Sequence, residues 1–124
     1  MTYRQDNLPA FLQGTDQAWD VPNIVRAATD LVPALDLTTA TEIEACFVND
    51  SGVELFSKTV TGGGVTVVDA NNITIQIDDT DTSALTISRK GLALSIRLTI
   101  TEADGRITKP WRGSVHVHAD ACGG

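Results

Sequence analysis

Apolar and polar residues alternate along several stretches of this chain. Ile73–Ile77 places an apolar side chain at every second position, and the run from Leu92 to Ile100 does the same. A period of two residues is typical of strands with one face in a core and the other in water, as in antiparallel sheets. No window keeps the helical i, i+3, i+4, i+7 spacing for long. The pattern therefore predicts an all-β protein.

Turn sequences divide the alternating runs at regular intervals. Asn49–Gly52 and Glu102–Gly105 are the clearest, because glycine accepts the positive φ that tight hairpins need. Pro110 should break the last run. Short strands with such spacing predict an antiparallel β-sandwich. We expect strands near residues 24–29, 42–48, 53–60, 65–68, 73–77, 92–101 and 106–118.

The first 23 residues differ, because their large apolar side chains follow no period. The sequence therefore predicts an extended N-terminal arm at 1–23, a sandwich domain at 24–119 and a short C-terminal tail at 120–124. Such an arm would either dock on a partner or wrap back onto its own domain. Its candidate interaction residues are Leu8, Phe11, Leu12, Trp19 and Val21.

Length and charge narrow the range of functions. A chain of 124 residues makes one domain, and its net charge of −7 argues against binding nucleic acid. No apolar run is long enough to cross a bilayer and no secretory signal is recognisable, so we expect no membrane partner and synthesis in a cytoplasm. Cys46 and Cys122 are expected to be reduced thiols there.

Three aspartates, Asp78, Asp79 and Asp81, form the densest acidic group. They begin like a calcium loop, but Ala84 and Lys90 stand where such a loop needs its glycine and its bidentate glutamate. A short helical turn over 78–85 explains them better, with Leu85 covering the end of the core.

A second group, His116, His118 and Asp120, shares one face of the last strand and is a weak candidate for a metal site. Val115 and Val117 would take the core face, which turns the histidines toward water or a partner. No cofactor is expected. Trp111 and Arg112 form either a partner-facing surface or a lid over the core. The sequence carries no nucleophile motif, so we expect no enzyme.

The order of these pieces resembles a known family. The run Asp36–Ile43 leads to the turn Asn49–Val53, then to Gly64–Asp69, Ile73–Ile77 and the turn Ala103–Arg106. This order is similar to the immunoglobulin-like N-terminal domain of bacteriophage baseplate upper proteins. The resemblance covers roughly residues 24–118 and implies an immunoglobulin-like antiparallel β-sandwich in the virion, in the tail or baseplate.

Proteins of that family carry no catalytic residues. The resemblance implies an adaptor or collar assembled in the bacterial cytoplasm, whose partners are other virion structural proteins in a homo- or hetero-oligomer. The arm and the strand edges would attach tail fibres or receptor-binding components. The alternative is a carbohydrate- or receptor-binding β-sandwich module, which would need some of its few aromatic side chains as a platform.

Overall fold

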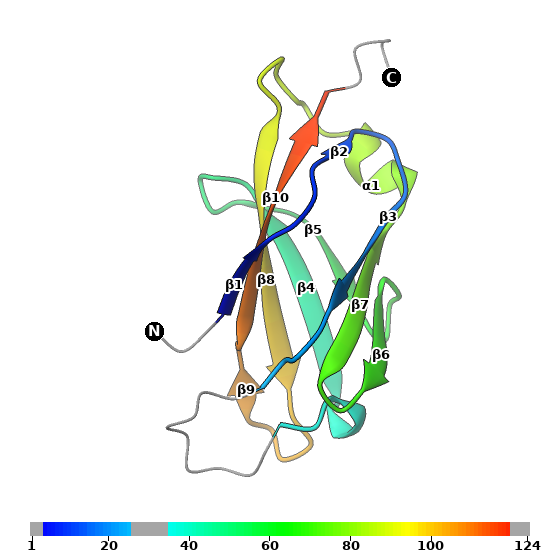
Figure 1. The fold of residues 1–124 in the computed structure, drawn as a ribbon, viewed down its shortest axis with the longest axis vertical. Coiled ribbons are helices and arrows are strands. Elements are labelled where there is room, and N and C mark those ends of the chain that lie inside the picture. The colour runs from blue at the N-terminus through cyan, green and yellow to red at the C-terminus, as the bar shows by residue number, and fades with distance from the viewer. Residues whose placement is uncertain (1–3, 26–34, 120–124) are drawn as a thin grey trace.

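The computed structural model describes residues 4–25 and 35–119 (Figure 1). Two layers of strands face each other, and the helical pieces among these residues are one 3₁₀ turn and one short α-helix. In chain order the elements are β1 (Arg4–Asn7), β2 (Phe11–Leu12), β3 (Gln17–Val21), η1 (Leu37–Thr39), β4 (Glu42–Val48), β5 (Glu54–Thr59), β6 (Val65–Asp69), β7 (Asn72–Ile77), α1 (Asp79–Ser83), β8 (Leu92–Thr101), β9 (Ile107–Thr108) and β10 (Trp111–His118).

The strand order identifies the fold. The large sheet has the order β1-β10-β8-β4-β5, with β2 also on β10 and β9 on β8, and the small sheet has the order β3-β7-β6. Among the described residues, β1 and β2 pair in parallel with β10, and the other strand pairs are antiparallel. The small sheet corresponds to the B-E-D strands of an immunoglobulin domain, and β10-β8-β4-β5 corresponds to G-F-C-C′. The protein is an all-β, immunoglobulin-like sandwich, as the sequence predicts.

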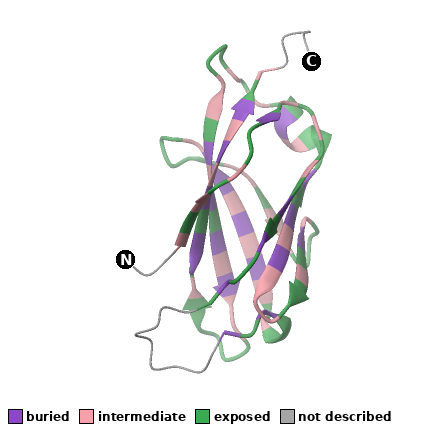
Figure 2. Cartoon of the chain, in the orientation of Figure 1, coloured by how far each residue is buried: buried purple, intermediate pink, exposed green. Residues whose placement is uncertain are grey.

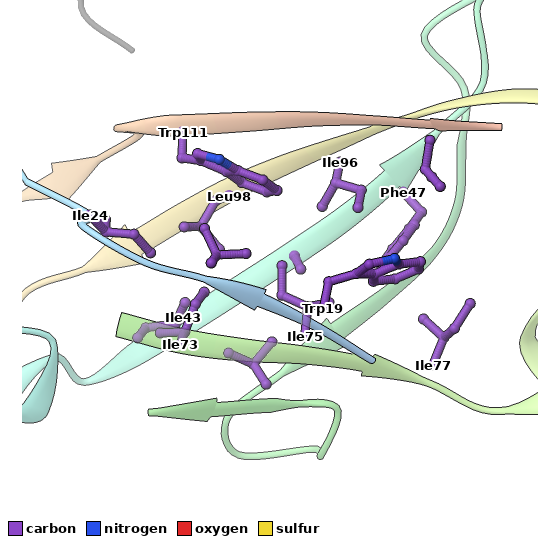
Figure 3. Packing of buried hydrophobic residues seen from close by; sticks show 14 of the residues in the cluster. Trp19, Ile24, Ile43, Phe47, Ile73, Ile75, Ile77, Ile96, Leu98 and Trp111 are labelled. Atoms are coloured by element: carbon purple, nitrogen blue, oxygen red, sulfur yellow. The ribbon is translucent and has the colours of Figure 1, made fainter. Parts of the chain in front are cut away.

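The core lies between the two sheets and is made mainly by the inward residues of β3, β4, β7, β8 and β10 (Figures 2 and 3). Ile43, Ala45 and Phe47 of β4 are buried, while Glu42 and Glu44 beside them face outward. Aromatic contacts join the layers: the Trp19 ring lies 6.3 Å from the Phe47 ring and 5.6 Å from the Phe11 ring, between centroids.

The N-terminal segment wraps back onto its own domain, which is one of the two predicted outcomes, and it is not an extended arm. The predicted domain boundary at residue 23 is therefore wrong. Residues 4–21 contribute three strands to the sandwich, and Phe11, Trp19 and Val21 are buried in the core of their own chain. Leu8 packs partly against the core, whereas Leu12 stays 53% exposed. The segment folds back because its backbone pairs with the edge of β10 and its aromatic rings become buried in the core. Pro9 and Gly14 break it into strands too short to show a period.

A polar cluster fastens β1 to both sheets. Trp111 Nε1 donates to Asp6 Oδ2 at 2.8 Å, and Arg4 Nε donates to the same oxygen at 3.1 Å. The other guanidinium nitrogens of Arg4 donate to the carbonyls of Pro22 and Asn23, just beyond β3. Arg4 thus links the edge of the large sheet to the end of the small sheet's first strand.

The other predicted strands lie close to those found. β4 and β8 have the predicted bounds, and β5, β6 and β7 agree within a residue or two. The predicted break at Pro110 is confirmed, since it separates β9 from β10. The predicted strand at 24–29 is not found at Ile24 and Val25, and its remainder lies outside the described residues, as does the tail at 120–124.

The helical turn after β7 is confirmed as α1. The backbone N–H of Asp78 donates to Asp81 Oδ2 at 2.7 Å, which caps the first turn. The residue that α1 buries is Thr82 rather than Leu85, which is only half-buried. Thr82 Oγ1 accepts a hydrogen bond of 2.9 Å from the backbone of Gly14, so α1 is attached to the β2–β3 turn.

Candidate functional site

Trp111 is not a partner-facing residue. Its side chain is 1% exposed, lies in the core and has its indole nitrogen bonded to Asp6. A Cβ added at Gly113 would lie 2.5 Å from the indole ring, so the ring also covers the backbone of its own strand. Trp111 is therefore a member of the core. Arg112 is exposed on the opposite, outer face of β10.

The two histidines also lie on the outer face of β10. His116 is half-buried and His118 is exposed, with 4.8 Å between their ring centroids. His116 Nε2 lies 2.9 Å from the carbonyl oxygen of Lys90, which occupies that nitrogen. Asp120 lies outside the described residues. Within residues 4–25 and 35–119, no three His, Cys, Asp or Glu side chains come together in a way that could hold a metal ion.

Cys46 lies on the outer face of β4, beside the large sheet's edge strand. Its thiol donates to Glu54 Oε1 at 2.9 Å. Partial burial, the hydrogen bond to Glu54 and the nearby carboxylates of Glu54 and Glu44 raise the pKa of the Cys46 thiol to about 12. The thiol therefore stays protonated near neutral pH and is a poor nucleophile.

The edges of the sheets are the surfaces that could accept another chain. Most edges of the described sandwich carry a feature that hinders strand addition. Pro9 interrupts the edge formed by β1 and β2, β9 has two residues, and β6 has a register shift between Val67 and Asp69. The β5 edge carries Lys58, and the β4–β5 pairing shifts register between Phe47 and Val48.

The free edge of β3 is the exception. All five of its residues pair with β7 without a register shift, and within the described residues no strand pairs on its other side. The sequence from Gln17 to Val21 contains no proline, lysine or arginine. Figure 1 shows β3 along one margin of the small sheet, beside β7.

A shallow groove lies next to this edge, at one end of the small sheet. Its volume is about 260 Å³, and it is lined by Asp20, Val21, Pro22, Val68, Asn72 and Ile73. Val68 is 61% exposed and is the most exposed large apolar residue among those described. The groove therefore presents an apolar surface beside the carboxylate of Asp20.

Two ranges of the chain that include the strands of the small sheet also hold nearly all of the net charge. Residues 13–25 and 59–88 contain six of the 16 acidic residues and none of the nine lysines and arginines. The rest of the chain has ten acidic and nine basic residues and is nearly neutral. Lys58, from β5, lies 2.7 Å from Asp81 and compensates part of the charge at α1. The edge of β3 lies on the acidic side of the molecule.

Sequence reasoning missed this edge, although two signals were present. Trp19 and Val21 alternate with Ala18 and Asp20, which is a strand pattern too short to stand out. The long stretch between Lys58 and Arg89 contains no basic residue. The sequence does not supply the sheet order, in which no other described strand pairs with the second side of β3.

No family model matches the sequence, and no curated protein matches it. Solved structures with a similar arrangement include CopC from Methylosinus trichosporium OB3b, with 10% identity, a TM-score of 0.44, and 96% of this chain and 95% of that chain covered. A second is the V domain of amphioxus IgVJ-C2, with 13% identity, a TM-score of 0.32, and 88% of this chain and 98% of that chain covered. A third is murine CRIg, with 12% identity, a TM-score of 0.38, and 92% of each chain covered. Scores this low carry no argument about function. No helix within the described residues is long and apolar enough to cross a membrane.

Proposed function

We propose that this chain is a non-enzymatic structural protein of a bacteriophage tail or baseplate. It acts as an adaptor or collar that docks tail-fibre or receptor-binding components as part of a homo- or hetero-oligomer in the virion, after assembly in the bacterial cytoplasm. Docking through an extended arm is withdrawn, because residues 4–21 fold into their own sandwich. Docking through strand edges remains.

One observation carries this proposal: within residues 4–25 and 35–119, the sandwich has protected edges except for a regular, unprotected one at β3. Isolated domains usually block such edges, since they promote aggregation, whereas assembly modules use them to add a neighbour's strand. The resemblance of the turn-and-strand order to baseplate domains is the reason for proposing a phage tail or baseplate as the particle. The carbohydrate-binding alternative loses its main platforms, because Trp19 and Trp111 are both buried.

The test is mass spectrometry of tail particles purified from the phage or prophage whose genome encodes the chain. We expect the chain in intact particles at a fixed ratio to other tail proteins, and particles lacking fibres when its gene is deleted. A particle preparation that retains its fibres and infectivity without the chain would overturn the proposal. A deletion that is complemented by the folded protein expressed separately serves as the control.

A further inference from the structure

We propose that the free edge of β3 binds an extended, lysine- or arginine-bearing segment of a partner protein, which adds as a further strand to the small sheet. The inference rests on the proposed function in one respect, namely that the chain works by docking. It goes further by naming the edge, the binding mode and the chemistry of the partner.

Backbone geometry determines what β3 offers. The backbone N–H of Gln76 donates to the carbonyl oxygen of Gly64, on the β6 side of β7. Because the backbone groups of successive residues in a strand point in alternate directions, the N–H groups of Ile75 and Ile77 point toward β3. Trp19 lies opposite Ile75 and therefore points back at β7. The backbone groups of Ala18 and Asp20 consequently face the open side, where an added strand finds its hydrogen-bond partners.

The charge around β3 favours one kind of incoming strand. Asp16 and Asp20 flank the edge, and no lysine or arginine occurs in β3, β6 or β7. An incoming segment with basic side chains gains attraction at Asp16 and Asp20. The Arg4 guanidinium lies beyond the end of β3, at the carbonyls of Pro22 and Asn23. A second copy of β3 is disfavoured, since antiparallel pairing of two such strands would bring the aspartates of both copies together. The occupant is therefore a basic segment of a different protein.

The groove beside Val68 sets a second requirement. A strand added next to β3 places alternate side chains on the outer face of the small sheet, where Asp20 and Pro22 already point. One of these side chains can lie over Pro22, at the β3 end of the groove of about 260 Å³, whereas Val68 lies on β6, beyond β7. The partner segment should thus carry an apolar residue two positions from a basic one.

A binding experiment with the full chain tests the inference. The probe is a short acetylated peptide of lysine, valine and threonine, and the matched peptide has glutamate in place of lysine. We expect the backbone amide NMR signals of Ala18 and Asp20 to shift with the lysine peptide only. Affinity should fall about tenfold or more at high salt, because the paired charges are exposed to solvent. Equal binding of both peptides, or shifts confined to the large sheet, would refute the inference.

Two variants and one control locate the site. Ala18→Pro removes an N–H on the open side, and Asp20→Lys reverses the charge there; each should weaken binding at least about tenfold. If Ala18→Pro does not fold, Asp20→Lys alone tests whether the β3 edge is the binding site. Asp50→Lys changes the same charge in the exposed β4–β5 turn and should leave affinity within about twofold. Unchanged binding by Asp20→Lys would refute the inference.

The same variants separate this inference from the proposed function. If folded Asp20→Lys protein enters tail particles at the normal ratio, the β3 edge is not the docking site and the inference fails while the function stands. If the lysine peptide binds β3 but the chain is absent from tail particles, the edge is confirmed and the virion function fails.

Discussion

The two sheets of this sandwich share one core but differ in how they meet solvent. The large sheet carries charges of both signs, and its edges are interrupted by a proline, an irregular register or a lysine. The small sheet carries no lysine or arginine and leaves β3 open. A sequence can therefore protect one layer against other chains while leaving the adjacent layer available to them.

The sharpest test of this comparison removes one core tryptophan from each sheet. Trp19→Ala, in the small sheet, and Trp111→Ala, in the large sheet, should each reduce the free energy of unfolding by about 3–5 kcal/mol, because each leaves a large cavity. Urea unfolding followed by circular dichroism measures this loss. Leu12→Ala is the matched control, since Leu12 is exposed and its loss should change stability by less than about 0.5 kcal/mol. Separate transitions for the two sheets would contradict a single cooperative core.

A smaller loss of stability is expected for a variant of the polar cluster that joins β1 to both sheets. Asp6→Ala removes the acceptor of the Trp111 indole N–H and leaves that buried donor unsatisfied, which should cost about 1–3 kcal/mol. The midpoint of thermal unfolding measures the change. Asn7→Ala, one residue along the same strand and exposed, should be nearly neutral. Equal stabilities of the two variants would show that this cluster does not hold β1 in place.

Lys58 is the basic residue that connects the sheets at α1. Lys58→Met removes its ion pairs with Asp81 and Asp78 and should lower stability by about 1 kcal/mol, because the pair is only partly shielded from water. Urea unfolding at low and high salt measures this effect, which salt should reduce. Lys90→Met removes an exposed lysine elsewhere and should show no such loss. A larger loss at high salt would contradict the electrostatic explanation.

The smallest effect concerns Cys46 on the large sheet. Folding raises the pKa of the Cys46 thiol from 9.0 to about 12, so the folded state favours the protonated thiol. The stability that this thiol contributes is therefore fully present below about pH 9 and is lost as the pH rises toward 12. Thiolate absorbance of a Cys122→Ser variant should therefore show no titration below pH 9. Glu54→Gln removes the accepting carboxylate and should lower the pKa of Cys46. A thiolate signal at pH 8 in the Cys122→Ser variant that retains Glu54 would refute this.

The sequence predicted the strands that alternate over many residues and missed those that do not. β4, β7 and β8 are long, with one face in the core, so their period is readable without the structure. β1, β2 and β3 are short and gain their burial from β10 and β7, which lie far along the chain. Trp111 could not be placed from sequence either, because its burial depends on Asp6, at the other end of the protein.

The parallel pairing of β1 with β10 has a mechanical consequence. The first strand of the chain lies beside the last, with Arg4 opposite Trp111 and Asn7 opposite Ser114. Tension applied between the two ends would slide these strands along each other, so the hydrogen bonds joining them would be loaded together in shear instead of opening one by one. We expect single-molecule stretching to give one high-force rupture, which Asp6→Ala lowers. Stepwise opening at low force would show that this strand pair does not resist tension as a unit.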